Sequence, residues 1–302
     1  MTPSKLEKAI LLTVSYSSVF DFPLKKEEIK WRLIGAQDFP PQNFEKILAK
    51  LVKKKLLFEE AGFYFLKNSK KSIVLRKKRK KIALKKRSDA RRFADFAQKI
   101  PFIKAIIITG SLSTNNTDFN DDIDWLIITT KRRLWIVRPL VLLISILFGK
   151  RRQKNGGHKD NSWCFNMFLE EGSLALPPSK RNIYTAHEVC QADFIFDRGG
   201  MKRVFMVENR WLGKYLPLFY KKELEGAPQK SGEIRGRGPK VRREFFLDSL
   251  NGIFYWLQYN YMKNHITKEV VRESLAFFHP RDTRGKVLKE WEKIVRKTIY
   301  DS

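Results

Sequence analysis

The beginning of the chain carries apolar side chains at helical spacing. One such pattern starts at Ser4, a second helix is expected after Pro23, and a third follows Pro40-Pro41. In the third helix the apolar residues fall at positions i, i+3, i+4 and i+7, which predicts a buried face made of Phe44, Ile47, Leu48 and Leu51. Two short β-prone pieces, residues 56–59 and 63–66, come next and are joined by a turn that contains a glycine.

Three helices followed by a β-hairpin resemble a winged helix-turn-helix domain, and the resemblance covers residues 1–67. In DNA-binding members of that class the third helix enters the major groove. The resemblance implies that its outward lysines contact phosphates: Lys46, Lys50, Lys53 and Lys54. A winged helix that binds protein, with these lysines solvated, is the alternative that the sequence leaves open.

The next segment, residues 68–92, is the most basic part of the chain. Lys67 to Arg92 holds 14 basic residues and one acid, Asp89. The spacing of its apolar residues permits a helix with a narrow apolar seam, which like charges destabilise unless a polyanion neutralises them. We therefore expect a basic linker helix with either solvated lysines or a contact to DNA or RNA through Lys77, Lys78, Lys80 and Lys81.

Composition limits the classes of function. The chain has 61 Lys and Arg against 32 Asp and Glu, a formal net charge of +29, which favours polyanionic partners. Its two cysteines, Cys164 and Cys190, are far apart, so neither a zinc knuckle nor a disulfide framework is expected and a cytoplasmic location fits. The apolar run 134–149 is short and contains Arg138 and Pro139, which favours a buried helix over a membrane span.

The residues that point to chemistry lie between Ala105 and Thr130. Two β-branched runs, 105–109 and 123–129, read as buried strands joined by a polar loop. The first run stops at a glycine and a serine. At the start of the second run, Asp122 and Asp124 are two residues apart, so an extended chain presents both carboxylates on one face. Adjacent carboxylates repel each other, and a hard divalent cation relieves that repulsion.

This arrangement resembles the signature of DNA polymerase β-like nucleotidyltransferases. It consists of a strand that ends in Gly110-Ser111, a loop of ten residues, and a second strand that begins with Asp-Ile-Asp. The resemblance implies that Gly110 and Ser111 bind the triphosphate, and that Asp122 and Asp124 bind Mg²⁺ or Mn²⁺. It also implies a reaction at the α-phosphate of a nucleoside triphosphate, with release of pyrophosphate. We expect this domain to span residues 93–220.

The third carboxylate of that family stands on a later strand, which matches Trp163 to Leu169 here. The residue at its centre is Asn166, which cannot accept a proton as a carboxylate does. Glu170 or Glu171 after this strand, or Asp160 before it, would be substitutes. Phe165 and Met167 are expected to face the core, away from Asn166.

Residues 221–243 are rich in Gly, Pro and charge and read as a flexible loop, and residues 244–302 read as a helical C-terminal region with an aromatic packing stripe. The expected fold is therefore an α/β, mixed-sheet nucleotidyltransferase core between a winged helix and these helices. We expect an enzyme that moves a nucleotidyl group from a nucleoside triphosphate to an acceptor the sequence does not identify. The alternative is a catalytically degenerate, nucleotide-binding regulator that binds DNA.

Overall fold

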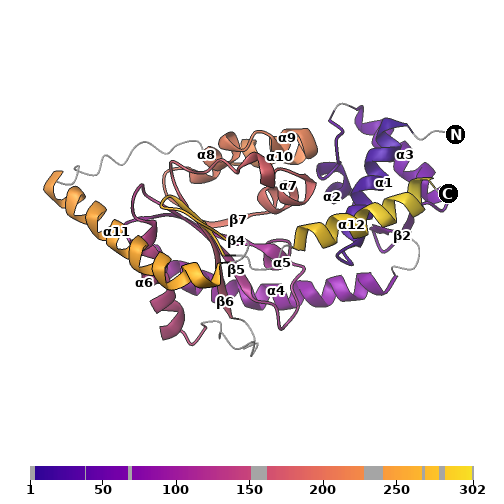
Figure 1. Cartoon of the computed structure of the whole chain (residues 1–302). Coiled ribbons are helices and arrows are strands. Elements are labelled where there is room, and N and C mark those ends of the chain that lie inside the picture. Colours follow the sequence, from indigo (N-terminus) through magenta and orange to yellow (C-terminus); the bar gives the residue numbers. More distant parts are fainter. Residues whose placement is uncertain are drawn as a thin grey trace.

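The computed structural model describes residues 4–37, 39–66, 70–150, 162–227, 241–266, 269–278 and 283–300. In these residues the chain is a mixed α/β protein with a six-stranded mixed sheet and a separate three-stranded antiparallel sheet (Figure 1). The small sheet belongs to the N-terminal region, and the large sheet forms the centre of the molecule. The mixed α/β class expected from the sequence is therefore confirmed.

The N-terminal region packs three helices against the small sheet. The helices are α1 (Lys5–Ser18), α2 (Lys26–Trp31) and α3 (Pro41–Lys53), and the strands are β1 (Leu24–Lys25), β2 (Phe58–Glu60) and β3 (Phe63–Phe65) in the order β1-β3-β2. Ser4 and Glu7 form a capping box that starts α1, because each side chain accepts from the other residue's backbone N–H. The predicted buried face of α3 forms, with Phe44, Leu48 and Leu51 in the core and Ile47 packed beside them.

The large sheet contains the two strands predicted around the acidic motif. Its members are β4 (Ile103–Thr109), β5 (Ile123–Thr129), β6 (Trp163–Glu170), β7 (Asp193–Asp197), β8 (Val270–Val271) and β9 (Leu275–Phe277). Their order is β7-β4-β5-β6-β9-β8, in which β5 and β6 are parallel and the other neighbours are antiparallel. The short helix α5 (Gly110–Ser113) follows β4 directly.

Helices cover both faces of this sheet. One face packs on α4 (Lys70–Ala97), α6 (Leu134–Leu147) and α11 (Val241–Met262). The other face packs on α7 (Ile183–Cys190), α8 (Met201–Glu208), α9 (Leu212–Tyr215) and α10 (Pro217–Glu225). The chain also forms short helical turns: η1 (Pro178–Lys180), η2 (Lys263–His265) and η3 (Arg296–Tyr300).

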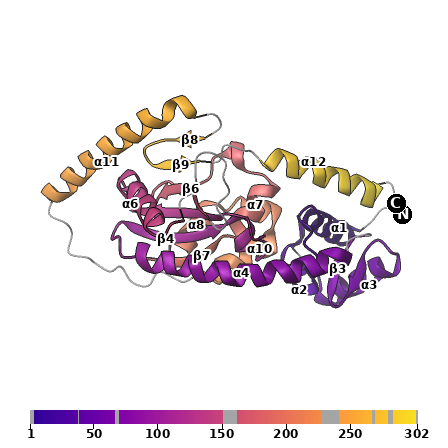
Figure 2. The ribbon, with the colours of Figure 1, turned by 90° about the horizontal axis from the view of Figure 1, so that it is seen from below.

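The helix α4 is more than a linker between two domains. It is 28 residues long and lies along both the N-terminal region and the large sheet (Figure 2). Its apolar seam is buried in the core of the sheet, through Ala83, Ala90, Phe93, Ala94 and Ala97. The buried seam consists mostly of alanines, which bury little area each but allow the helix to approach the sheet closely.

The C-terminal part of the chain differs from the expected set of helices. Within residues 244–302, β8 and β9 join the large sheet, and α12 (Thr283–Val295) returns to the N-terminal region, where it packs on α1 (Figure 1). There the Trp291 indole N–H donates to the Leu12 carbonyl at 3.2 Å. Part of the predicted loop 221–243 is also helical, since α10 extends to Glu225, while residues 228–240 lie outside the described residues.

Helices α6 and α11 lie side by side and are buried along one side only. Trp135, Val137 and Val141 of α6 enter the core, but Leu143 and Leu147 are exposed. The aromatic stripe of α11 was expected to pack, yet much of it is exposed, including Phe246 and Tyr261. Neither helix meets the length and apolarity that a bilayer requires, and the same holds for every other helix in the described parts of the chain.

Candidate functional site

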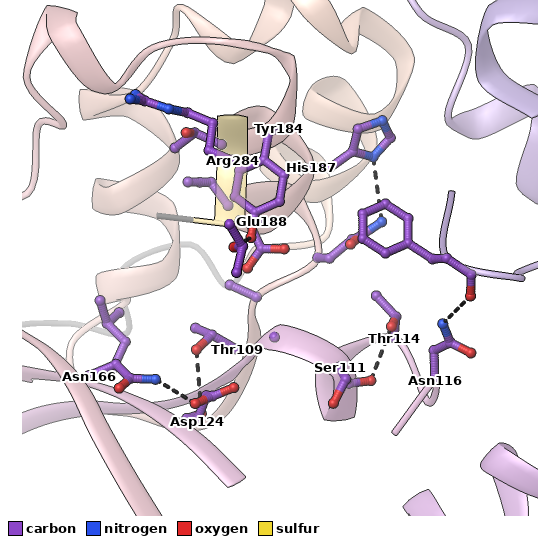
Figure 3. A pocket seen from close by; sticks show the side chains of 18 of the residues that line it. Thr109, Ser111, Thr114, Asn116, Asp124, Asn166, Tyr184, His187, Glu188 and Arg284 are labelled. Carbon is purple, nitrogen blue, oxygen red and sulfur yellow. Dashed lines mark hydrogen bonds between the residues drawn. The ribbon is translucent and has the colours of Figure 1, made fainter. Parts of the chain in front are cut away.

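A pocket of about 1430 Å³ lies between the large sheet, helix α7 and the N-terminal region. Its sheet side consists of the ends of β4, β5 and β6 with the start of α5 and the facing part of α7. Its N-terminal side consists of residues from α1, the turn after α1 and the end of α2. Figure 3 shows the pocket, with Asp124 and Asn166 on the strands and Glu188 on the opposite wall.

Gly110 and Asp124 lie directly against each other on the sheet side. The register of β4 and β5 pairs Thr109 with Asp124, so the residue after β4 is brought to the aspartate. Gly110 has a φ of +64°, and a Cβ built on it would lie 2.5 Å from Asp124 Oδ2. A side chain is therefore excluded both by the backbone conformation and by the carboxylate. The motif glycine is required because the backbone approaches an acid that lines the pocket.

The loop between the two strands is held by Asp121. Its Oδ2 accepts hydrogen bonds from the Asp118 backbone N–H at 2.8 Å, from Ser111 Oγ at 3.1 Å and from Thr117 Oγ1 at 3.2 Å. Asp121 is thus the capping acid of this loop. The Ser111 hydroxyl is engaged inside the protein, which leaves the backbone N–H groups at the start of α5 as the part of the Gly-Ser motif able to meet a ligand.

Asn166 reaches Asp124 from the neighbouring strand. Its Nδ2 donates to Asp124 Oδ1, and its Oδ1 accepts from Cys164 Sγ at 2.8 Å. The β5–β6 register shifts at this point, with Trp125 paired to Phe165 and Leu126 paired to Met167. This irregularity lets Asn166 and Met167 both line the pocket, while Phe165 enters the core on the other face. Met167 packs partly against the core, as expected, but it lines the pocket together with Asn166, so the expectation that it faces away from Asn166 was wrong.

The other acids considered as substitutes for Asn166 have different places. Glu170 is the last residue of β6 and Glu171 follows it, at the end of the strand away from the pocket, because Glu170 pairs with Thr129 whereas Cys164 pairs with Asp124. Burial raises the pKa of Glu170, whose carboxylate faces backbone N–H groups at the start of α6, and Glu171 forms an ion pair with Lys104. Asp160 lies outside the described residues.

Glu188 is a pocket acid that the sequence pattern did not reveal. It belongs to α7 and lies across the pocket from the strand ends (Figure 3). Burial, and secondarily the negative charge of Asp124, raise the pKa of Glu188 to about 7. A carboxyl group with this pKa exchanges a proton near neutral pH, which suits it to accept a proton from a bound hydroxyl. Its sequence context, TAHEVC, has no known motif, and only the fold brings it here.

The residues around Asp124 supply oxygen donors suited to a magnesium ion. Asp124 lines the pocket, and Asp122, just before β5, lies outside the pocket lining. Within the described residues, no group of three His, Cys, Asp or Glu side chains could hold a metal ion. Mg²⁺ is commonly bound by one or two carboxylates together with substrate phosphates, so Asp124 is suited in chemical kind to bind the ion with phosphate oxygens. In this structure Asn166 turns its amide nitrogen, and not its oxygen, to Asp124.

His187, next to Glu188 in α7, has a structural environment. Its ring is 2% exposed and stacks on Tyr16 at a centroid distance of 4.1 Å. Burial, with the nearby positive charge of Arg32, holds the pKa of His187 well below its ordinary value, so the ring is neutral. The stack joins α7 to α1 and thereby fixes the N-terminal region against the pocket wall.

The lysines predicted to bind nucleic acid lie on two exposed helix faces. On α3, Lys46, Lys53 and Lys54 are exposed, but Lys50 forms a 2.7 Å ion pair with Glu7. Lys50 is therefore partly neutralised within the protein. On α4 the four predicted lysines are exposed and have no ion pair with any residue that the structure describes: Lys77, Lys78, Lys80 and Lys81.

The inward basic residues of α4 are bound to the protein instead. Arg76 pairs with Glu28 at 2.6 Å, Arg79 pairs with Asp118 at 2.9 Å, and Arg87 pairs with Asp193. Lys86 Nζ donates to the carbonyls of Asp118 and Asp121. The basic residues of this helix are thus divided between a face that holds the pocket loop and the N-terminal region, and a face open to solvent.

Comparison with known proteins gives no relative: no protein-family model, curated protein or solved structure matches the chain.

Proposed function

We propose that this protein is a nucleotidyltransferase that transfers a nucleotidyl group from a nucleoside triphosphate to an acceptor hydroxyl. The observation that carries the proposal is the contact between Gly110, just after β4, and Asp124 near the start of the paired strand β5. This is the contact that the polymerase β-like motif implies, and it lines a pocket large enough for a nucleotide. The mixed sheet around it supports a nucleotidyltransferase core of that superfamily.

Each pocket residue has a role in this proposal. The backbone at Gly110 and Ser111 binds the phosphates of the triphosphate, and Asp122 and Asp124 hold a divalent cation. When bound, the cation supplies positive charge to the phosphate oxygens. The acceptor oxygen forms a bond to the α-phosphorus as the bond to pyrophosphate breaks, and Glu188 takes the hydroxyl proton. The raised pKa of Glu188 supports this last role.

The N-terminal region fits the winged helix-turn-helix class in its order of elements. Helix, strand, two helices and a hairpin follow one another, and β1 completes the small sheet beside β3. Together with the open lysines of α4, this order supports DNA or RNA as a partner of the protein. A nucleic-acid end carrying a free hydroxyl is the acceptor class that both features favour.

The proposal is tested by incubation with each α-labelled nucleoside triphosphate and Mg²⁺ or Mn²⁺, with and without RNA or DNA oligonucleotides. We expect label in the acceptor or in the protein itself, and pyrophosphate release in equal amount. The Asp124→Asn variant should lose both signals, while Asp95→Asn, an exposed acid on α4, serves as the matched control. Labelled product that persists in Asp124→Asn would contradict the assignment.

One observation favours a second function. Asn166 donates its amide to Asp124 at the place of the family's third carboxylate, so a neutral group stands where an acid is expected. A regulator that binds nucleotide without turning it over, and binds DNA through its N-terminal region, is consistent with this substitution. Binding of Mg-nucleotide that depends on Asp124, with no product from any triphosphate, would select this function over the enzyme.

A further inference from the structure

The N-terminal side of the pocket contains a guanidinium group that forms no ion pair within the described part of the chain. Arg32 follows the last residue of α2 and lines the pocket. It makes no ion pair or side-chain hydrogen bond with the residues that the structure describes, and its Cζ lies 5.5 Å and 5.7 Å from the ring centroids of Phe22 and Phe219. Burial lowers the pKa of Arg32, yet a guanidinium remains charged at physiological pH.

A second arginine of the pocket lining is neutralised by an acid. Arg79, which also lines the pocket, is paired with Asp118. The acid nearest in sequence to Arg32, Glu28, is already engaged by Arg76 at 2.6 Å. The negative charge of Glu28 acts on Arg32 from nearby, but Arg32 forms no direct ion pair within the described residues. A partly buried charge without an ion pair is costly, and a ligand of opposite charge would offset that cost.

Two further groups of the pocket lining could contribute to binding an anion. Lys180, at the end of η1, lines the pocket and forms no ion pair with the described residues. His187 is almost fully buried beside Tyr16, and its Nε2 has no hydrogen-bond partner in the described part of the chain. Two cations and an unsatisfied ring nitrogen thus line the pocket together with the acids of the sheet side.

The pocket is large enough to bind a phosphate on its N-terminal side in addition to a nucleotide on its sheet side. Pockets for small ligands usually measure about 300–1,000 Å³, whereas this one measures about 1430 Å³. A nucleotide bound at Gly110 and Asp124 leaves room beside it. Arg32 lies beside the aromatic rings of Phe22 and Phe219 and is only partly exposed, and its planar guanidinium suits a two-point contact with phosphate oxygens.

We propose that Arg32, assisted by Lys180, is a phosphate-binding site of this pocket, separate from the Gly110–Asp124 motif. The ligand group is a phosphate, either the end of the triphosphate or a phosphate of the acceptor. In naming these two sources the inference rests on the proposed function, but the site itself does not require Asp124 or a metal ion.

The site is tested by calorimetric titration of pyrophosphate in the presence of a chelator, with the full-length protein. We expect wild type and Asp124→Asn to bind, and Arg32→Gln to bind about 10- to 100-fold more weakly, as for loss of a charged hydrogen bond. Arg32→Lys should fall between them. Arg91→Gln removes an equal charge from the exposed face of α4 and should bind as wild type does. Thermal unfolding of each variant checks that the fold is retained.

Titration with Mg²⁺ and a non-hydrolysable triphosphate analogue identifies the source of the phosphate. Weaker analogue binding in Arg32→Gln assigns the site to the triphosphate, and unchanged binding assigns it to the acceptor. Absence of pyrophosphate binding in wild type, or equal binding by Arg32→Gln, overturns the site. If Asp124→Asn still loses the Mg-analogue in that case, the proposed function stands alone. If only Arg32 matters, the phosphate site stands and the metal assignment fails.

Discussion

The charged groups on the sheet side of the pocket and those on its N-terminal side differ in the partners that the fold gives them. On the sheet side the fold supplies partners: Asp121 accepts three hydrogen bonds from its loop, and Asp124 accepts the Asn166 amide. On the N-terminal side Arg32 has no such partner in the described structure. Hydrogen bonds within the protein hold the carboxylates of the sheet side in place before a ligand binds, whereas Arg32 would gain an ionic partner only when an anionic ligand binds. We therefore expect substitutions on the sheet side to change geometry and those on the N-terminal side to change affinity.

The largest effect is expected from Gly110→Ala. The added methyl group would meet Asp124 and would need a positive φ, so the strand end must shift. Backbone strain of this kind costs about 1–3 kcal/mol, and we expect complete loss of Mg-dependent nucleotide binding by calorimetry. Gly62→Ala is the matched control, because Gly62 also has a positive φ but nothing within 4 Å of its Cβ position. Equal behaviour of the two variants would show that contact with Asp124 is unimportant.

Asn166→Asp tests whether the missing acid limits the rate. A carboxylate here replaces an amide beside Asp124, and general-base catalysis is typically worth about 10² to 10⁴ in rate. We expect faster turnover and tighter Mg²⁺ binding, measured by pyrophosphate release and calorimetry. Asn166→Ala, which removes the amide without adding charge, should show neither gain. Turnover that is fast in wild type and falls in Asn166→Asp would mean that the amide itself is the working group.

The pH dependence of stability should contain a contribution from Glu188. Its pKa is raised from 4.5 to about 7, so the folded state binds more protons than the unfolded state between these values. The free energy of unfolding contributed by this group therefore falls as pH rises from about 4.5 to 7. Urea denaturation in the presence of a chelator should show this fall reduced in Glu188→Gln. The control Glu208→Gln, at an exposed position, should follow wild type.

Arg79→Gln tests the link between the two sides of the pocket. Arg79 bonds Asp118 and Asn116 of the pocket loop and also the Phe20 carbonyl of the N-terminal region. Because Asp118 is partly exposed, we expect a modest loss of about 1 kcal/mol in the free energy of unfolding. Chemical denaturation followed by two probes, one in each region, should also show less coincident transitions. An unchanged midpoint and unchanged coincidence would assign the coupling to the Tyr16–His187 stack.

The smallest effect on stability is expected from glutamine at the four open lysines of α4. These side chains have no acidic partner in the described structure, so their replacement removes no ion pair, and the relief of repulsion between like charges should raise the free energy of unfolding only slightly. Binding of an RNA or DNA oligonucleotide should weaken, and its dependence on salt should become shallower by about one unit for each phosphate that a lysine no longer neutralises. A salt series with and without the substitutions measures both. Identical slopes would identify these lysines as solvated only.

Local pattern was sufficient to predict some of this structure. The β-branched runs on both sides of the loop form β4 and β5, as their residue types predict. The contact between Gly110 and Asp124 was not predicted, because it depends on the register of these two strands. Glu188 could not be predicted, because α7 meets the strand ends only after the sheet has formed. The strands β8 and β9 were missed since they are two and three residues long and take their stability from pairing with β6. The buried alanines of α4 were also not predicted, because they lie between many lysines and arginines and the segment therefore has little apolar character in sequence.

The return of the C-terminal elements to the pocket has a consequence for synthesis on the ribosome. Phe277, Thr283 and Arg284 line the pocket but are translated after its other walls. Until β9 emerges, the outer edge of β6 has no partner, and unpaired strand edges promote association between nascent chains. The nascent protein therefore passes through a stage at which the acids and Arg32 have been made while the pocket is still open at this edge.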